Sequence, residues 1–366
     1  MVGSRSKELT AMRYDLLVFI GRFQPFHQGH LAVLRQALAE TRHLLILVGS
    51  AHRPRSTRDP FSADERALMI RACFADAADD LARITIAPLD DVMYNDTVWI
   101  RNVQRAVSDC AQAIHPEREE AELRIGLVGH GKDRTSYYLR MFPAWGSVDV
   151  ASHEGISATE VRGLYFTQPF ESGHVPAAAE AILAGRLPPQ VCDWLRRFAA
   201  KPAYAELKAE QEFVDKYRSQ FAALKYPAQH HTADAVVIQS GHILLVRRGA
   251  RPGLGQLALP GGFVRPEETT LDAAIRELRE ETRLKVPEPV LRGSLSGKDQ
   301  FDDPHRSTRG RTFTSAFRFD LRAETELPKV KGGDDAKEAF WLPLARLRPE
   351  EMFEDHYFII QKMVGL

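Results

Sequence analysis

Short apolar runs alternate with longer amphipathic segments over the first half of the chain. The apolar runs read DLLVFIG, HLLILVGS, RITIAPL, LRIGLVGH and SVDVAS, and the amphipathic segments read HLAVLRQALAE, ADERALMIRACFAD and TVWIRNVQRAVSDC. A repeated strand–helix order is typical of a parallel sheet whose two faces are covered by helices. The pattern therefore predicts an α/β domain.

The pattern changes after about Pro176, where AAAEAILAG, VCDWLRRFAA and YAELKAEQEFVDKYRSQF read as consecutive helices. Alternation returns from Thr232 in ADAVVIQSGHILLVRRG, which predicts two strands joined by a turn at Gly241 and a second domain of α+β type. The first dozen residues lack periodicity and read as a loose leader. We expect a first domain over residues 13–185, a helical connector over 186–228 and a second domain over 229–366.

Composition limits the partners of these domains. A chain of 366 residues exceeds the size at which one core usually stops growing, which supports two domains. Lys+Arg and Asp+Glu are both 49, so no overall field favours nucleic acid or an anionic membrane. Three widely spaced cysteines and no apolar run long enough to span a bilayer indicate a cytoplasmic protein. We expect small-molecule nucleotides as partners, no nucleic acid and no membrane, and a homo-oligomer remains open.

The stretch GRFQPFHQGH follows the first predicted strand, which ends at Gly21. Ligands of open parallel sheets bind beyond the carboxyl ends of strands, where helix N-termini favour anions. A helix beginning near Gly29 would place His27 and His30 one turn apart, so that both imidazoles face one anion, with Arg22 as a bidentate clamp. The alternative is that the two histidines merely begin a helix.

A second segment of this kind is GISATEVRG. Ser157 and Thr159 are natural helix-capping residues, and Arg162 falls one turn into the helix that follows. A second phosphate-binding segment after another strand favours the functional interpretation of the first.

Together, GRFQPFHQGH and ISATEVR resemble the HxGH-type nucleotidyltransferases, and specifically the archaeal-type nicotinamide mononucleotide (NMN) adenylyltransferases; DPFSADER and PLDDVMYNDTVW also match. The resemblance implies a Rossmann-like nucleotidyltransferase sheet that transfers AMP from ATP to NMN. It implies catalytic roles for His27, His30, Arg22 and Arg162, and substrate contacts from Gly21, Phe23, Gln24, Gly29, Asn95, Trp99, Ser157 and Thr159. For Trp99, the proposed platform for the nicotinamide ring, a place in the core is nearly as good an explanation.

The second domain contains GGFVRPEETTLDAAIRELREETRL, which spaces Gly262, Glu268, Arg276, Glu277, Glu280 and Glu281 as in the Nudix box. On a helix the last three carboxylates share one face and repel each other unless a divalent cation or Arg276 neutralises them. Mg²⁺ or Mn²⁺ suits such oxygen ligands. We expect Glu277, Glu280 and Glu281 to bind metal, with Glu280 and Glu281 catalytic; a solvated acidic helix face is the alternative. Mg²⁺, with Mn²⁺ as a substitute, is expected at both sites, with ATP and NMN as substrates.

The late glycine of the box is Arg283 in this chain. That position normally holds a left-handed residue that ends the helix, which costs a residue with a Cβ about 1 kcal/mol. Because this position binds no metal, the replacement is expected to weaken the geometry and to leave the ligands in place.

Two further segments, FDDPHRSTRGRTF and GGDDAKEAFWLPL, resemble Nudix enzymes that hydrolyse ADP-ribose. The resemblance implies substrate contacts from Phe301, Arg306, Arg309, Gly262 and Arg276, and products AMP and ribose 5-phosphate. Candidates for the acid that deprotonates water are Glu281, Asp302, Asp303, Asp334 and Glu354. Two alternatives stay open: a Nudix domain that senses ADP-ribose or another NAD metabolite without cleaving it, and a first domain that adenylylates another phosphate ester.

Overall fold

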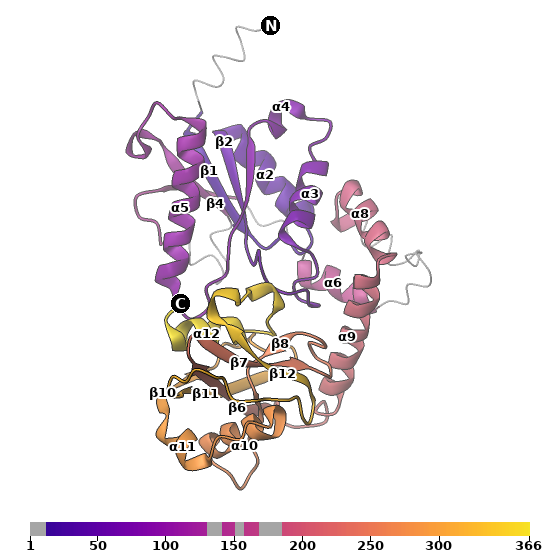
Figure 1. Cartoon of the computed structure of the whole chain (residues 1–366). Coiled ribbons are helices and arrows are strands. Elements are labelled where there is room, and N and C mark those ends of the chain that lie inside the picture. Colours follow the sequence, from indigo (N-terminus) through magenta and orange to yellow (C-terminus); the bar gives the residue numbers. More distant parts are fainter. Residues whose placement is uncertain (1–11, 130–140, 151–156, 168–184) are drawn as a thin grey trace, which may run out of the picture. The chain divides into compact units, whose positions relative to one another are not determined.

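The computed structural model describes residues 12–129, 141–150, 157–167 and 185–366, which form two compact units (Figure 1). The units are Met1–Lys208 and Ala209–Leu366. The predicted leader and most of the predicted helix AAAEAILAG lie outside the described residues.

The first unit is built on a parallel sheet of five strands in the order β3-β2-β1-β4-β5. The strands are β1 (Tyr14–Gly21), β2 (Thr41–Val48), β3 (Ile84–Pro88), β4 (Ile125–Gly129) and β5 (Gly146–Asp149). The strand order reverses beyond β1, which lies between β2 and β4. Such a reversal creates a crevice at the carboxyl ends of the central strands, so the chain after Gly21 emerges where ligands of this architecture bind. The predicted α/β sheet is confirmed.

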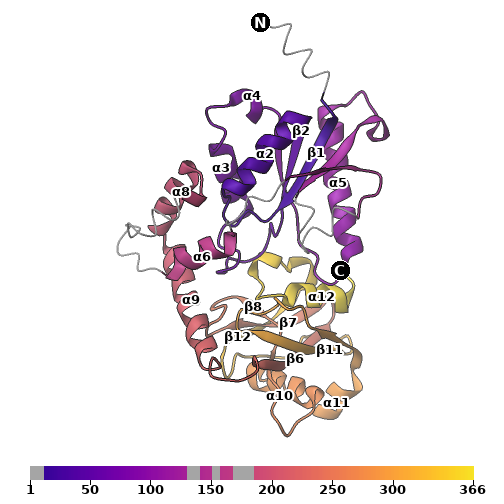
Figure 2. The same ribbon diagram turned by 180° about the vertical axis from the view of Figure 1, so that it is seen from behind.

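Helices cover both faces of this sheet (Figures 1 and 2). They are α2 (Gln28–Glu40), α3 (Ala63–Ala72), α4 (Ala78–Leu81), α5 (Asp96–Ile114) and α6 (Ala158–Thr167), with a 3₁₀ turn η1 (Glu120–Glu122). Alternate residues of β1 point to opposite faces. Leu17 packs into one core with α2, α3 and α6, whereas Leu16 and Val18 pack into another core with α5. Both faces are therefore apolar, as the continuous apolar runs predicted.

The predicted connector is divided between the two units. Helices α8 (Pro189–Ala199) and α9 (Pro202–Ser219) follow one another as expected, and the boundary between the units falls within α9. Val191, Leu195 and Phe198 of α8 are buried in the same core as α2 and α3. Helix α8 is thus an integral part of the first unit.

The second unit contains a mixed sheet of seven strands, in which β10-β11-β6-β7-β12 form the main path. The strands are β6 (Gln229–Gln239), β7 (His242–Arg248), β8 (Leu257–Ala258), β9 (Gly261–Phe263), β10 (Leu295–Phe301), β11 (Arg311–Asp320) and β12 (Ala336–Pro343). Strands β11 and β6 are parallel, and the other pairs are antiparallel. The turn between β6 and β7 is at Gly241, as predicted, with a positive φ of 72°.

The helices of the second unit are α10 (Thr270–Thr282), α11 (Glu288–Gly293) and α12 (His356–Val364), with 3₁₀ turns η3 (Leu344–Arg346) and η4 (Pro349–Glu351). Helix α10 begins with a capping box, because the side chains of Thr269 and Asp272 each accept the other's backbone N–H. Its apolar face, which includes Ala274 and Leu278, packs on the sheet against Phe317 and other residues of β6, β7 and β11. The α+β expectation for this unit is confirmed.

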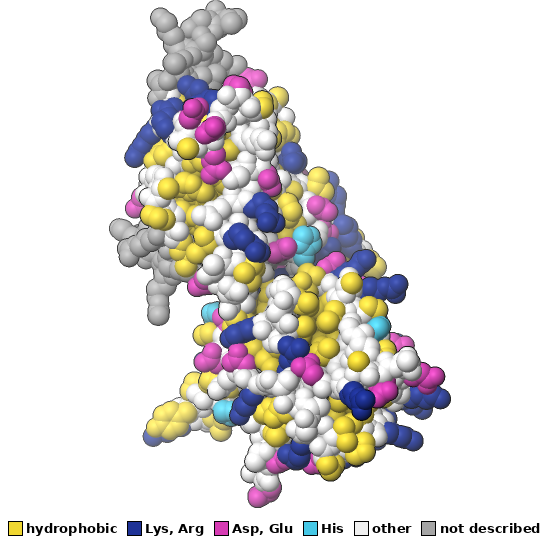
Figure 3. All heavy atoms as spheres, turned by 60° about the vertical axis from the view of Figure 1, so that its left-hand side comes forward, with side chains coloured by type: hydrophobic (Ala, Val, Ile, Leu, Met, Phe, Trp, Pro, Cys, Tyr) yellow, Lys and Arg dark blue, Asp and Glu magenta, His cyan; other side chains and the backbone are white. Residues whose placement is uncertain are grey.

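On the face shown in Figure 3, acidic and basic side chains are interspersed. Among the helices in the described ranges, none combines the length and the apolar character needed to cross a bilayer.

Arg283 ends α10 in the left-handed conformation that the box position requires, with φ 53° and ψ 24°. Its N–H donates to Arg279 O at 3.1 Å. The replacement of glycine by arginine therefore leaves the helix end in place but adds the steric cost of a Cβ.

We predict that Arg283→Gly is more stable than Arg283→Ala by about 1 kcal/mol, because both variants lose the side chain but only alanine retains the Cβ strain. Amide hydrogen exchange of α10 in the full-length protein measures this difference. Equal protection in the two variants would show that the left-handed conformation costs nothing here.

Asp15 is a buried carboxylate at the start of β1. Its side chain is 3 % exposed and accepts hydrogen bonds from Arg124 N, Nε and Nη2 at 3.0, 3.0 and 3.1 Å. Burial alone would raise the pKa of Asp15, but the hydrogen bonds and charge of Arg124 lower this pKa to about 2. Asp15 thus fastens β1 to the residue that precedes β4.

Asp15→Asn is expected to destabilise the first unit by about 1–3 kcal/mol near pH 7, because an amide donates where Arg124 needs an acceptor. The folded pKa of Asp15 lies below the unfolded value of about 3.9, so its contribution is present above about pH 4 and is lost as the pH falls toward 2. Urea unfolding followed by tryptophan fluorescence checks both points. The exposed Asp76→Asn is the control. A difference between protein and variant that does not shrink between about pH 5 and 3 would contradict the prediction.

Candidate functional site

The two histidines of the opening motif form a reciprocal cap at the N-terminus of α2. His27 N donates to His30 Nδ1 at 3.3 Å, and His30 N donates to His27 Nδ1 at 3.4 Å. The two rings stack with centroids 3.6 Å apart. Because each Nδ1 accepts a backbone proton, the neutral rings carry their own proton on Nε2, which becomes the donor nitrogen of each ring. The cap therefore fixes both the orientation and the tautomer of the histidines.

The predicted helix start is confirmed within one residue, and Gly29 is buried in its first turn. Phe23 lies edge-on against His30, with centroids 4.9 Å apart, and has a positive φ of 52°. A Cβ on Gly21 would lie 2.8 Å from the Phe23 ring, so glycine is required there by space. Phe23 therefore packs against the His30 ring, and Gly21 leaves the space that the Phe23 ring occupies.

Gln24 holds the loop that leads into α2. Its amide Nε2 donates to Phe61 O at 2.9 Å, and its Oε1 accepts from Phe61 N at 3.0 Å. Both partners are buried. Gln24 was predicted to contact substrate, whereas its amide in this structure is engaged by the backbone before α3.

Arg162 joins the two segments that were predicted to bind phosphate. Its Nη1 donates to Gln24 O at 2.7 Å, and its Nη2 donates to Thr159 Oγ1 at 3.2 Å. Burial and the nearby charge of Arg22 lower the pKa of Arg162 to about 10, so it stays protonated near neutral pH. The Ser157 Oγ accepts Thr159 N at 3.2 Å at the start of α6, as a capping residue. The structure thus brings the segments of Arg22 and Arg162 together.

Arg66 is a residue that sequence reasoning did not single out. It is fully buried, and its guanidinium donates to Arg22 O at 2.7 Å, Gly49 O at 2.6 Å and Ser50 O at 3.1 Å. Burial lowers the pKa of Arg66 to about 10. Its place within DPFSADER was the available signal. Its partners could not be read from the sequence, because the loops after β1 and β2 meet only in the fold.

Acidic groups accompany these arginines. Asp59 is buried, lies 3.8 Å from Arg53 Nη1 and has one carboxylate oxygen, Oδ1, without a hydrogen-bond partner. Asp91 accepts from Ser50 N and Oγ at 3.2 and 2.7 Å. The arginines exceed these acids around the carboxyl ends of β1 and β2, which favours an anionic ligand.

Asn95 and Trp99 lie at the start of α5. Asn95 is the N-cap, and its Oδ1 accepts Val98 N at 3.3 Å. Trp99 is half-buried and packs against the α5 core, with Phe142 at 6.3 Å between centroids. Trp99 is therefore anchored by the core but is not enclosed by it.

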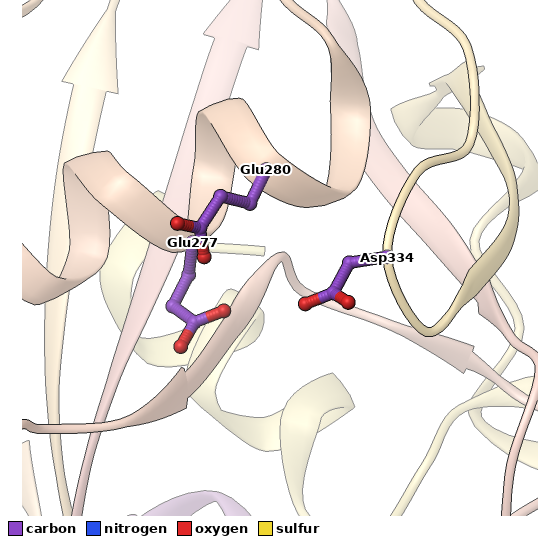
Figure 4. Close-up of side chains that lie close together, drawn as sticks. All are labelled: Glu277, Glu280 and Asp334. Carbon is purple, nitrogen blue, oxygen red and sulfur yellow. The ribbon is translucent and has the colours of Figure 1, made fainter.

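The second candidate site gathers three carboxylates of the second unit. Glu277 and Glu280 extend from α10 and Asp334 from the loop before β12, and Figure 4 shows the Asp334 carboxylate turned toward the other two. One carboxylate oxygen of each lies within 4.8 Å of the others. Two of the three predicted metal ligands are thus brought together, and Asp334 joins them from outside the Nudix box.

Arg276 neutralises part of this charge. Its Nη1 donates to Glu277 at 2.7 Å and to Glu280 at 3.0 Å, and its Nε and Nη2 bind Glu268. Hydrogen bonds from Arg276 lower the pKa of Glu268 to about 2. Burial raises the pKa of Glu277, and the neighbouring carboxylates raise it further. A Cβ on Gly262 would collide with the Glu277 carboxylate, so glycine admits this side chain.

Glu281 lies apart from the three-carboxylate group. It is 8 % exposed, and its Oε2 accepts Gly261 N at 3.0 Å. Burial and the charges of Glu277 and Asp335 raise the pKa of Glu281 to about 8. Its role as a metal ligand stays a prediction, and its observed contact ties α10 to β9.

The predicted ADP-ribose contacts differ in exposure. Phe301 is fully buried. Arg306 is 3 % exposed and forms a bidentate pair with the buried Asp355, both bonds being 2.9 Å. Arg309 is half-buried, and its guanidinium lies over the exposed ring of Phe263 at 5.2 Å. Of these three, Arg309 is the side chain placed to meet a ligand.

The candidates for the general base differ in exposure and in hydrogen bonding. Asp302 is exposed, and Asp303 caps its own loop by accepting His305 N at 2.7 Å. Glu354 has a positive φ of 44°, and its Oε1 accepts Ser307 Oγ at 2.8 Å and Thr308 N at 3.0 Å. Burial raises the pKa of Glu354. Glu281 and Glu354 are thus the candidates whose environment favours holding a proton.

Two family models match the chain, one on each unit. Residues 18–164 match the cytidylyltransferase-like family, and residues 228–363 match the NUDIX domain. The nicotinamide/nicotinic acid mononucleotide adenylyltransferase of Acinetobacter baylyi is 36% identical over 209 residues, which covers 57% of this chain and 96% of that protein. The nicotinamide-nucleotide adenylyltransferase of Ignicoccus hospitalis is 41% identical over 167 residues, which covers 45% of this chain and 89% of that protein.

Solved structures extend the similarity to both units. A bifunctional NMN adenylyltransferase/ADP ribose pyrophosphatase from Francisella tularensis has a TM-score of 0.84 and 33% identity, and the match covers 96% of this chain and 99% of that one. A structure described in the same words, complexed with AMP and a manganese ion, matches with the same TM-score and 32% identity. The similarity spans two different domains in the same order, so this chain belongs to the family of bifunctional enzymes that join an NMN adenylyltransferase to a Nudix hydrolase.

Proposed function

We propose that the first unit transfers AMP from ATP to NMN at the site formed by His27, His30, Arg22 and Arg162. The observation that carries this proposal is the reciprocal histidine cap at the N-terminus of α2. It directs two imidazole donors and the positive end of a helix dipole to the same place, and Arg162 links that place to the second predicted segment.

In the proposed reaction a phosphate oxygen of NMN attacks the α-phosphorus of ATP. A new P–O bond forms, the bond from that phosphorus to the bridging oxygen of the β-phosphate breaks, and pyrophosphate leaves with the electron pair. No covalent enzyme intermediate is required, so positioning and charge stabilisation suffice. The Nε2–H groups of His27 and His30 donate to phosphate oxygens, and the exposed Arg22 adds positive charge. Mg²⁺ would enter this site as a complex with ATP.

Trp99 is the proposed platform for the nicotinamide ring. Its half-buried indole is held at the start of α5, next to the Asn95 cap. Stacking on a fixed ring suits a planar pyridine, and Asn95 supplies amide groups near it. The phosphate chemistry is the same for nicotinic acid mononucleotide, so the preference between the two substrates would be set at this end of the site.

For the second unit we propose Mg²⁺-dependent hydrolysis of ADP-ribose to AMP and ribose 5-phosphate. The chain offers a fitting site, since three carboxylate oxygens lie within 4.8 Å of one another and hard divalent cations prefer such ligands. Glu277, Glu280 and Asp334 would hold the cation, which when bound supplies Lewis-acid polarisation of the pyrophosphate and activates water. Glu281 or Glu354 would accept the proton in its ionised form, because burial raises the pKa of both carboxyls and so makes each carboxylate a stronger base. Arg309 would orient the substrate.

The thiols suit a reducing compartment. Burial raises the pKa of the Cys73 thiol to about 12 and also raises the pKa of the Cys110 thiol, so both stay protonated near neutral pH. We therefore propose that the protein works in the cytoplasm, where such thiols stay reduced.

His30→Ala is expected to lower NAD formation by roughly a hundredfold or more, because it removes one charge-stabilising donor and half of the reciprocal cap. Release of pyrophosphate from ATP and NMN measures this. ADP-ribose hydrolysis by the same preparation should be unchanged. His115→Ala, at the far end of α5, is the matched control. Near-normal turnover in His30→Ala would refute the assignment.

Glu280→Gln is expected to lower ADP-ribose hydrolysis by about a hundredfold, because the amide keeps the size but weakens a cation held by carboxylates. Mg²⁺ should raise the melting temperature of this variant less than that of the original protein. Metal-free stability should stay level within a few tenths of a kcal/mol, since the loss of repulsion is offset by the loss of the Arg276 contact.

The half-buried Glu288→Gln of α11 is the control for this experiment, and adenylyl transfer should be unchanged in both variants. Equal hydrolysis and equal Mg²⁺ stabilisation in all three proteins would refute the catalytic role of α10. Binding of ADP-ribose by the original protein without release of AMP would instead indicate a sensor.

A further inference from the structure

The loop that carries Asp334 is attached to the C-terminal end of α10. Gly333 N donates to Glu281 O at 3.0 Å, and Lys331 N donates to Thr282 O at 2.9 Å. These are carbonyls of the last turn, which have no partner inside a helix. The end of the Nudix-box helix and the loop 331–335 therefore satisfy each other's backbone groups.

The attachment is close enough to exclude a side chain at residue 333. A Cβ on Gly333 would lie 2.5 Å from Glu280 O, 2.5 Å from Arg283 Nε and 3.0 Å from Arg283 Cζ. The φ of Gly333 is not positive, so space and not conformation requires glycine here. The guanidinium of Arg283 and the backbone carbonyl of Glu280 therefore both lie against the side of Gly333 from which a side chain would extend.

We infer that Arg283, which replaces the box glycine, is a positioning residue for the metal site: its side chain holds Gly333 against α10 and thereby sets the place of Asp334. The inference rests on the proposed metal site. Asp334 follows Gly333 directly, has a left-handed φ of 50°, and is the one member of the carboxylate group that α10 does not supply. A loop pinned at Gly333 loses little further freedom when Asp334 binds an ion, so pinning increases affinity.

The charge of Arg283 acts in the opposite direction, since a cation repels a cation. This effect is small, because the Arg283 side chain is exposed and an exposed charge is screened by solvent and salt. We therefore expect the packing of Arg283 on Gly333 to increase the metal affinity by more than charge repulsion decreases it.

Mn²⁺ binding to the full-length protein, measured by electron paramagnetic resonance without nucleotide, tests the inference. Arg283→Gly and Arg283→Ala should each raise the Kd for Mn²⁺ by about tenfold, the lower end of what the loss of an outer-shell partner costs. Gly333→Ala should raise it at least as much. Because Arg283→Gly is expected to be the more stable of the two Arg283 variants, similar weakening in both would show that affinity does not follow fold stability.

Matched controls are Arg292→Ala, which removes an exposed arginine of the same unit, and Gly293→Ala, where an added Cβ meets no atom within 4 Å. Both should leave the Kd unchanged. In an Asp334→Asn background, Arg283→Ala should have no further effect, because Arg283 acts through Asp334.

The outcomes separate this inference from the proposed function. Unchanged Mn²⁺ affinity in Asp334→Asn would remove Asp334 from the metal site and overturn this inference, whereas the proposed hydrolysis stands or falls with the Glu280→Gln experiment. A weakened Asp334→Asn with unchanged or tighter binding in Arg283→Gly and Arg283→Ala would overturn the role of Arg283 alone. An equal effect of Arg283→Ala with and without Asp334 would also overturn it.

Discussion

Two buried arginines hold together the loops that follow the strands of the first sheet. Arg66 binds carbonyls after β1 and β2, and Arg162 binds the carbonyl of Gln24 and the Thr159 hydroxyl of α6. Burying a guanidinium without hydrogen-bond partners would cost several kcal/mol, and burying the loop carbonyls without a donor would also be unfavourable. Each group is stable only in the presence of the other, which fixes the loops in one arrangement.

The histidine cap depends on that arrangement. His27 and His30 satisfy two N–H groups at the start of α2. The His30 ring packs on Phe23, which belongs to the loop fixed by Arg66 and Gln24. Preorganised donors of this kind lose little freedom when charge develops on a phosphate, which is why they stabilise a transition state effectively. Arg66 and Arg162 thus help to hold the histidine donors in position, whether or not either arginine contacts substrate.

The second unit has the opposite electrostatic requirement, because its candidate site gathers negative charges. Like charges on α10 repel, and Arg276 binds Glu277, Glu280 and Glu268 at once. In the last turn of the same helix, the carbonyls of Glu281 and Thr282, which have no intrahelical partner, accept hydrogen bonds from the loop that carries Asp334. Both units therefore build their sites at helix ends, the first at an N-terminus for anions and the second beside a C-terminus where a loop supplies a carboxylate.

The sequence alone determined what depends on short spacing. The order of strands and helices, the start of α2, the shared face of Glu277 and Glu280 and the left-handed end at Arg283 all follow from periods of a few residues, and the structure contains each of them. The family followed from the same motifs. These features were accessible because the geometry of a helix turn relates near neighbours without reference to the rest of the chain.

Only the tertiary structure decided which distant residues meet. It divided the connector by burying α8 in the first core, placed Asp334 beside Glu277 and Glu280, turned Glu281 toward Gly261, and buried Phe301 and the Arg306–Asp355 pair. It also assigned Arg66 to three loop carbonyls. A residue type and its spacing along the chain do not reveal whether a charged side chain will face a ligand or a buried partner. That choice depends on contacts between segments far apart in sequence, which exist only after the sheet and its helices have packed.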